Sequence, residues 1–182
     1  MCCTIGCTAW VPSIYTFHTG WLLARSLIPG SSGHEEVLLT WKAFWVLWLC
    51  GVLCIYVNYA ADVQKSYVRG CNGKCNVWGA PAKVIRAEYV DDKGRKKRSL
   101  LLYSGFWGIS RHFHYIPEIL GALFWTVPVH YSSILPYFYV IYLIILLFDR
   151  AGRDDERCRN KYGKYWDKYC KYVPYKVVPF LF

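Results

Sequence analysis

The sequence predicts an all-α integral membrane protein that crosses the bilayer several times, with about four membrane-embedded helical segments. Three observations support this fold class. Apolar residues make up 55% of the 182 residues, although the formal net charge is +10. Long stretches carry no charged side chain, and Lys and Arg are concentrated in two blocks, with 11 of the 22 in 61–112 and 9 in 149–182. A chain this apolar does not stay disordered.

Composition also argues against a nucleic-acid-binding module. Charged residues and aromatic residues each account for 19% of the chain, whereas a basic nucleic-acid-binding domain of this size normally has more charge and fewer aromatics. We therefore expect no nucleic-acid partner.

The stretches without charge are the candidate membrane spans. They cover 1–24, 43–61 and 119–148. A helix needs about 20 mainly apolar residues to cross the hydrocarbon layer, and 43–61 meets that length. We also expect a span over 4–24, although Pro12 and Gly20 interrupt it.

The 119–148 stretch is too long for one crossing, because a helix of that length would measure about 45 Å. Pro128 and Pro136 interrupt it near its middle. We therefore expect a membrane hairpin with one arm at about 116–128 and the other at about 134–148.

The basic blocks predict the orientation of the chain. Lys and Arg near the ends of membrane spans mark the cytosolic side, and a hairpin between the two blocks would leave both in the cytosol. We expect two membrane spans in 1–60, a cytosolic basic loop in 61–115, the membrane hairpin in 116–148, and a cytosolic tail with a helix in 149–182.

Within the basic loop, the sequence predicts a short β-hairpin. Residues 83–90 partly alternate between apolar and polar, as in a strand. Residues 91–94 read Asp-Asp-Lys-Gly, and 95–102 can form the second, returning strand. Asp and Gly are typical of such turns. The nearby pair Cys71 and Cys75 lacks a second cysteine pair at ligand spacing, so we predict no metal site.

Two groups of cations in this loop are candidates for binding anions. Lys65 and Arg69 lie one helical turn apart just beyond 43–61, where each can hold an anionic group. From spacing alone, ordinary anchoring at the membrane face is the simpler interpretation. The Arg-Lys-Lys-Arg run at 95–98 is expected to contact anionic lipid headgroups.

A second candidate site lies in the tail. Arg150, Asp154, Cys158 and Tyr162 recur every four residues, so a helix would present them as one stripe. Such a stripe suits a nucleotide, because Arg binds phosphate, Asp accepts hydrogen bonds and Tyr stacks. Ion pairs along a helix at the membrane face explain the spacing equally well.

Several motifs resemble those of the membrane sterol reductase family. The motifs are Leu-Tyr-Ser-Gly-Phe-Trp-Gly-Ile-Ser-Arg-His-Phe-His-Tyr at 102–115, Leu-Pro-Tyr-Phe-Tyr at 135–139 and Arg-Asp-Asp-Glu-Arg-Cys at 153–158, followed by Lys-Tyr-Gly at 161–163 and Trp166. The resemblance implies a multi-pass enzyme of the endoplasmic reticulum membrane. It would transfer a hydride from NADPH to a sterol ring double bond after protonation, with C7=C8 of a Δ5,7-sterol as the expected target.

The resemblance also implies roles for eleven residues. Lys65 and Arg69 would hold the NADPH phosphates, while Leu102 and Trp107 would pack against its rings or ribose. Arg111, His114 and Tyr115 would line the nucleotide pocket, and Arg150, Asp154, Cys158 and Tyr162 would form its other wall. No catalytic proton donor is assigned; Tyr15 and the imidazoles of His112 and His114 are candidates. Sterol and membrane lipid are the expected partners, with other sterol-pathway enzymes as further candidates.

The resemblance is confined to the C-terminal part of such an enzyme, so we expect this chain to be its cofactor half. Two alternatives stay open. One is an S-adenosylmethionine-dependent enzyme like the isoprenylcysteine carboxyl methyltransferases, whose architecture is similar. The other is a catalytically inactive fragment that binds sterol or a protein partner.

Overall fold

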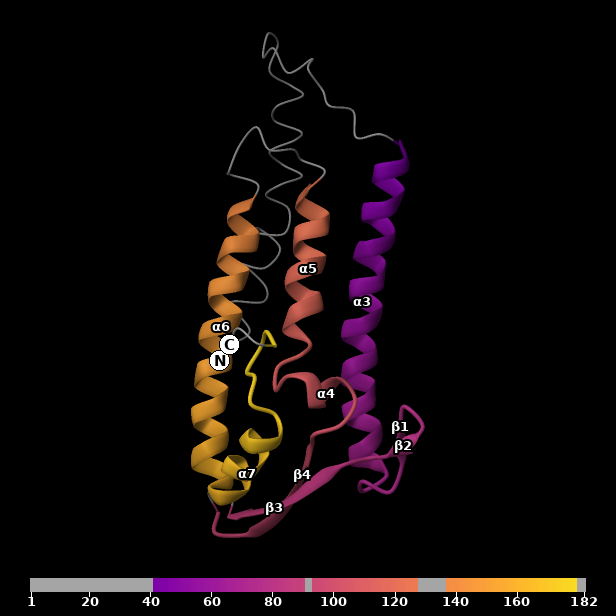
Figure 1. Ribbon diagram of the computed structural model, residues 1–182. Coiled ribbons are helices and arrows are strands. Elements are labelled where there is room, and N and C mark those ends of the chain that lie inside the picture. The colour runs from indigo at the N-terminus through magenta and orange to yellow at the C-terminus, as the bar shows by residue number, and fades with distance from the viewer. Residues whose placement is uncertain (1–40, 91–92, 128–136, 180–182) are drawn as a thin grey trace. The chain divides into compact units, whose positions relative to one another are not determined.

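The computed structural model describes residues 41–90, 93–127 and 137–179. The elements are α3 (Trp41–Gly70), β1 (Asn76–Val77), β2 (Ala80–Pro81), β3 (Val84–Val90), β4 (Lys96–Leu102), α4 (Phe106–Ile109), α5 (Tyr115–Thr126), α6 (Phe138–Tyr162) and α7 (Lys164–Tyr172) (Figure 1). The chain divides into two compact units. The first unit comprises Met1–Cys54 and Ile119–Ile145, and the second unit comprises Ile55–Glu118 and Leu146–Phe182.

Helix α3 contains the predicted span 43–61. Within the described residues, its stretch Lys42–Gly70 is the one helix long and apolar enough to cross a membrane, judged by length and composition. Large apolar side chains such as Leu49 and Ile55 are 62% and 57% exposed, as expected for a helix that faces lipid. The predicted span 4–24 lies outside the described residues.

The two arms of the predicted hairpin contain helix α5 and the start of helix α6. The connection over 128–136, with both of its prolines, lies outside the described residues. Helix α6 includes both the second predicted arm and the first part of the predicted tail, and it ends at Tyr162. The i, i+4 ion pair between Arg153 and Asp149, with 2.8 Å between Nη2 and Oδ2, supports this continuation.

Close helix packing in the first unit depends on small residues. A Cβ atom on Gly51 of α3 would lie 3.7 Å from the indole nitrogen of Trp125 on α5, and one on Gly121 would lie 3.6 Å from Cβ of Cys54. Small residues let helix backbones approach each other closely in a membrane. Beside this contact is a shallow apolar hollow lined by Phe44, Leu47, Trp48, Gly51, Phe124 and Trp125.

Helix α3 ends in a left-handed turn in the second unit. Asn72 and Gly73 have φ angles of 51° and 75°, and the Gly73 amide donates to the Val68 carbonyl over 2.9 Å. A Cβ atom on Gly73 would lie 2.8 Å from Cγ2 of Val84. Both the conformation and the close approach therefore require glycine at position 73.

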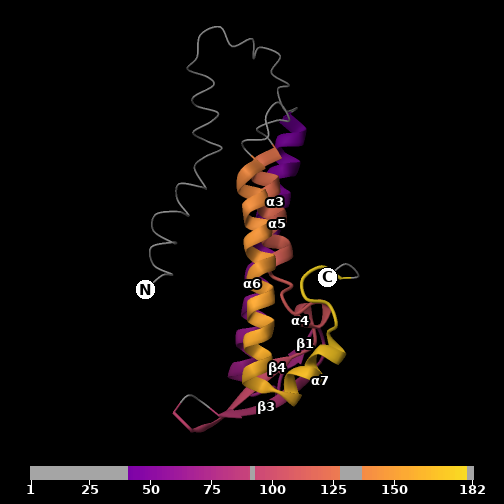
Figure 2. The same ribbon diagram turned by 90° about the vertical axis from the view of Figure 1, so that its left-hand side faces the viewer.

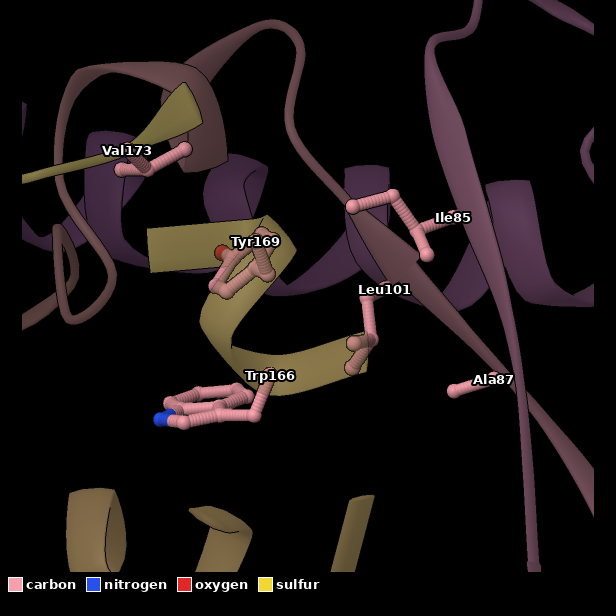
Figure 3. Close-up of a cluster of buried hydrophobic side chains, with 6 residues drawn as sticks. All are labelled: Ile85, Ala87, Leu101, Trp166, Tyr169 and Val173. Carbon is pink, nitrogen blue, oxygen red and sulfur yellow. The ribbon is translucent and has the colours of Figure 1, made fainter. Parts of the chain in front are cut away.

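The predicted β-hairpin is confirmed as the antiparallel pair β3 and β4, with Val84 opposite Leu102 and Val90 opposite Lys96. Because successive side chains point to opposite faces of a strand, Leu101 and Leu102 enter different clusters. Ile85, Ala87 and Leu101 pack against Trp166, Tyr169 and Val173, which come from α7 and the residue that follows it (Figure 3). Helix α7 thus covers one face of this hairpin (Figure 2). The small β1–β2 hairpin was not predicted.

Candidate functional site

All eleven residues that the resemblance implies for the cofactor lie in the second unit. They come from four parts of that unit: the last turns of α3, the end of β4 with α4, the segment 110–115, and the second half of α6.

Trp107 connects α4 to the end of α3. Its side chain is 3% exposed, and its indole N–H donates to the Ala61 carbonyl over 2.9 Å. The Lys65 ammonium lies 3.7 Å from the centre of the indole ring, a distance typical of a cation–π contact. Leu102 packs in the same cluster, together with Val68 and other apolar residues.

Next to Trp107 is a group of closely packed rings. His114 lies 5.3 Å from Trp107 and 4.3 Å from Tyr115, measured between ring centres. His112 stacks on Tyr115 at 5.1 Å, with only 9° between the ring planes. Nδ1 of His114 is buried and has no hydrogen-bond partner in the part of the chain that the structure describes.

Burial lowers the pKa of both imidazoles to about 4. For His112 the neighbouring His114 adds to this effect. For His114 the fields of Lys65 and Arg150 oppose those of Asp62 and Asp154. Both rings are therefore neutral at pH 7, and they offer ring nitrogens rather than positive charge.

We expect the stability of the protein in detergent to fall as the pH is lowered from about 6.5 to about 4. Both imidazoles have a lower pKa in the folded state than in the unfolded state, so the unfolded state binds more protons in this window. Each ring contributes up to about 3 kcal/mol above pH 6.5, and this contribution is lost on acidification. Thermal unfolding midpoints across this pH range measure the effect.

The control for this prediction is His114→Phe, which keeps an aromatic ring and removes the titrating group. The dependence of the midpoint on pH between 4 and 6.5 should then be smaller than in the parent protein. Identical pH profiles for the two proteins would show that His114 is not neutralised by burial.

The predicted stripe on α6 is present on one continuous helix, but its members have different surroundings. The side chain of Arg150 is 63% exposed, and its Nε lies 3.9 Å from Oδ2 of Asp154. Cys158 and Tyr162 pack against the cluster between α7 and the β3–β4 hairpin. The Tyr162 hydroxyl donates to Oγ of Ser99 over 3.3 Å.

The structure brings one part of the predicted set together. The same charged groups, Lys65 of α3 and Asp154 of α6, act on the pKa of His112, His114 and Cys158. Contacts show the same grouping, because the Lys65 ammonium lies 3.7 Å from the centre of the Trp107 ring and His114 lies 5.3 Å from that ring. Tyr162 instead contacts Ser99 and Tyr89 of the β-hairpin.

Cys158 is not suited to act as a nucleophile. Burial raises the pKa of its thiol, and the carboxylates of Asp154 and Asp155 raise it further. Since the thiolate is the reactive form, a thiol in this setting contributes bulk and polarity. In the ranges that the structure describes, no group of three or more His, Cys, Asp or Glu side chains is arranged to hold a metal ion.

Arg111 is directed into the protein. Its side chain is 6% exposed, and Nη1 lies 2.8 Å from Oδ1 of Asp155 in a buried ion pair. The same nitrogen donates to Sγ of Cys170 over 2.6 Å, and Nη2 donates to the Pro174 carbonyl over 3.3 Å. These contacts engage both terminal nitrogens, which a phosphate would need, while Nε is buried without a hydrogen-bond partner in the described ranges.

Sequence reasoning included Asp155 and Trp166 in the family motifs but assigned neither of them a role. The Asp155 carboxylate also accepts the indole N–H of Trp166 over 3.1 Å. A signal was present in the spacing, because Leu147, Ala151 and Asp155 follow each other at intervals of four on the buried face of α6. A carboxylate that continues an apolar stripe is expected to have a buried partner.

Comparison with known proteins identifies the class. The model of the Ergosterol biosynthesis ERG4/ERG24 family matches residues 3–182. The chain therefore belongs to this family of membrane sterol reductases, and the resemblance seen in the sequence is confirmed.

Individual relatives agree with this assignment. The chain is 52% identical over 175 residues to the 7-dehydrocholesterol reductase of Arabidopsis thaliana, covering 96% of this chain and 38% of the relative. It is 36% identical to the 7-dehydrocholesterol reductase of Xenopus laevis, covering 97% of this chain and 35% of the relative. It is 35% identical to the Delta(14)-sterol reductase of Methylotuvimicrobium alcaliphilum, covering 96% of this chain and 36% of the relative. The chain thus spans well under half the length of these relatives.

Proposed function

We propose that this chain supplies the NADPH-binding part of a sterol reductase that reduces the C7=C8 bond of 7-dehydrocholesterol or a related Δ5,7-sterol. Membership of the family supports reduction of a sterol double bond. The 52% identity to the 7-dehydrocholesterol reductase of Arabidopsis thaliana favours the C7=C8 bond, since identity to the Delta(14)-sterol reductase quoted above is 35%. The substrate would reach the enzyme through the lipid of the endoplasmic reticulum membrane.

One observation carries the assignment of NADPH: cations, closely packed aromatic rings and a buried imidazole nitrogen that has no partner in the described ranges gather at one place. Nδ1 of His114 has no hydrogen-bond partner in the described ranges, and a bound group with a donor or acceptor would satisfy it. Lys65 and Arg150 both act on the pKa of the same ring. Such cations suit the phosphates of a dinucleotide.

Each side chain has a distinct part in this proposal. NADPH supplies a hydride when it is bound. Lys65, Arg69 and Arg150 would neutralise its phosphates, and Asp154 would accept hydrogen bonds from a ribose or an amide. Neutral His114 would contact an uncharged polar group, and the adjoining rings of Trp107 and Tyr115 would exclude water.

Replacing Asp154 with alanine is expected to raise the Kd for NADPH about tenfold, about 1.4 kcal/mol, because a hydrogen-bond acceptor is lost. The side chain of Asp154 is 33% exposed, so the fold should tolerate the change. Titration of the detergent-solubilised protein with NADPH, followed by calorimetry, measures the affinity.

The control is Asp149→Ala, which removes an exposed carboxylate from the same helix and should leave the Kd unchanged. Equal affinity of the Asp154→Ala variant and the parent protein would remove Asp154 from the site. Selective binding of S-adenosylmethionine instead of NADPH would overturn the proposed function in favour of a methyltransferase.

The substrate is tested in cells that lack 7-dehydrocholesterol reductase. Sterols are extracted after expression of the 182-residue chain and, in parallel, of a full-length relative. A fall in 7-dehydrocholesterol with this chain would show that it reduces the sterol by itself. Persistence of the sterol with this chain, and its loss with the relative, would show that this chain is a fragment that does not reduce the sterol by itself.

A further inference from the structure

The buried ion pair between Arg111 and Asp155 joins two segments that are distant in sequence. The two side chains are 6% and 11% exposed, and 2.8 Å separate Nη1 from Oδ1. Trp166 of α7 donates its indole N–H to the same carboxylate oxygen. One oxygen atom of Asp155 therefore connects α6, the segment 110–115 and α7.

The segment around Arg111 is also held through its backbone. The Arg111 amide donates to the Tyr175 carbonyl over 3.0 Å, and the His112 amide donates to the Lys176 carbonyl over 2.8 Å. With the bond from Nη2 to the Pro174 carbonyl, three bonds join this segment to residues 174–176. The position of His112 and His114 therefore depends on these bonds.

The place of Asp155 on α6 relates it to the candidate site. Successive residues on an α-helix are about 100° apart around the helix axis. Asp155 lies on the buried face, whereas Asp154, one residue before it, is partly exposed. If α6 turned about its axis, the contact of Asp155 with Arg111 and the direction of Asp154 would change together.

We propose that Asp155 is a positioning residue for the cofactor site, acting through Arg111 and Trp166 without touching the cofactor. Its carboxylate sets the rotation of α6, which carries Arg150 and Asp154, against the segment that carries His112 and His114. This inference rests on the proposed function, because the site that it organises is the NADPH site. It also gives Arg111 a structural role in place of the pocket-lining role that the resemblance implies.

A purely stabilising role makes a different prediction. Buried ion pairs often contribute little net stability compared with apolar residues of the same size, although removal of one partner is costly. A pair that only stabilised the fold would change the unfolding temperature and leave the affinity of the remaining folded protein unaltered. A positioning pair changes the affinity of the folded protein.

The test uses Asp155→Asn in the 182-residue chain in detergent, with Asp149→Asn on the exposed side of α6 as the matched control. The amide keeps an oxygen acceptor for Arg111 and Trp166 and removes the charge. Two quantities are measured well below the unfolding temperature. They are the Kd for NADPH and the hydrogen exchange of a peptide spanning 110–115, compared with a peptide spanning 84–90 of β3.

We expect the Asp155→Asn variant to bind NADPH about tenfold more weakly, since small displacements of a binding group reduce affinity strongly. Exchange at 110–115 should be faster while exchange at 84–90 is unchanged, and the control variant should behave like the parent protein. If Asp155→Asn does not fold, Arg111→Lys tests the same pair from the other side, because lysine lacks the second terminal nitrogen, which in Arg111 donates to the Pro174 carbonyl.

The possible outcomes separate the two proposals. Faster exchange at 110–115 with an unchanged Kd would overturn the positioning role, and so would a raised Kd without any local change in exchange. If the parent protein does not bind NADPH, the proposed function and the cofactor part of this inference both fail. The exchange data then still decide whether Asp155 holds α6 against the 110–115 segment.

Discussion

Replacement of Trp107 with alanine should lower the free energy of unfolding by about 3–5 kcal/mol. The indole ring is 3% exposed and packs with Val68 and Leu102, so its removal leaves a cavity in this cluster. The variant also loses the hydrogen bond to the Ala61 carbonyl and the contact with the Lys65 ammonium. Denaturant unfolding in detergent, followed by circular dichroism, measures the change.

Trp78→Ala is the matched control, because the Trp78 side chain is 64% exposed and has an edge-on contact with Phe106. This variant should lower the free energy of unfolding by about 1 kcal/mol or less. Equal losses for the two tryptophans would contradict the role of Trp107 as the packing centre between α3 and α4. Trp107→Phe keeps a ring but not the N–H group. Its free energy of unfolding should lie between those of the parent protein and the alanine variant.

Replacement of Arg111 with methionine should lower the free energy of unfolding by about 3–5 kcal/mol, because it leaves the Asp155 carboxylate buried without its cation. The 2.8 Å ion pair and the bonds to Cys170 and Pro174 are lost together. The second variant, Arg111→Met combined with Asp155→Leu, places two apolar side chains where the charges were. It should be clearly more stable than Arg111→Met alone.

A double-mutant cycle on these variants measures the coupling of the pair. The single variants Arg111→Met and Asp155→Leu, the double variant and the parent protein are unfolded under the same conditions in detergent. We expect a coupling energy of at least about 2 kcal/mol for a buried pair at this distance. Strictly additive losses would show that Arg111 and Asp155 act independently and would contradict the coupling expected from their 2.8 Å ion pair.

Local sequence patterns were sufficient for the elements that depend on near neighbours. The charge-free stretch 43–61 predicted the membrane helix within α3, and the alternation with its Asp-Asp-Lys-Gly turn predicted the β3–β4 hairpin. The four-residue spacing of Arg150 and Asp154 placed them on one helix. In each case the signal lies within one element, because periodicity and turn residues act over short distances.

The full length of helix α6 was harder to predict from the sequence. The sequence changes from apolar to charged residues near 149, yet the helix continues, and ion pairs at i, i+4 support its charged part. A change from apolar to charged residues therefore does not by itself mark the end of a helix.

By itself, the sequence determined the class of this protein: a membrane helix, basic segments beside it, and motifs that identify the sterol reductase family. Tertiary structure alone decided which polar residues face the site and which are buried. Arg111 and Asp155 are 44 residues apart, and Arg111 and Cys170 are 59 residues apart. Neither residue type nor spacing reveals such partners, because a carboxylate is buried only where the fold brings a cation to meet it.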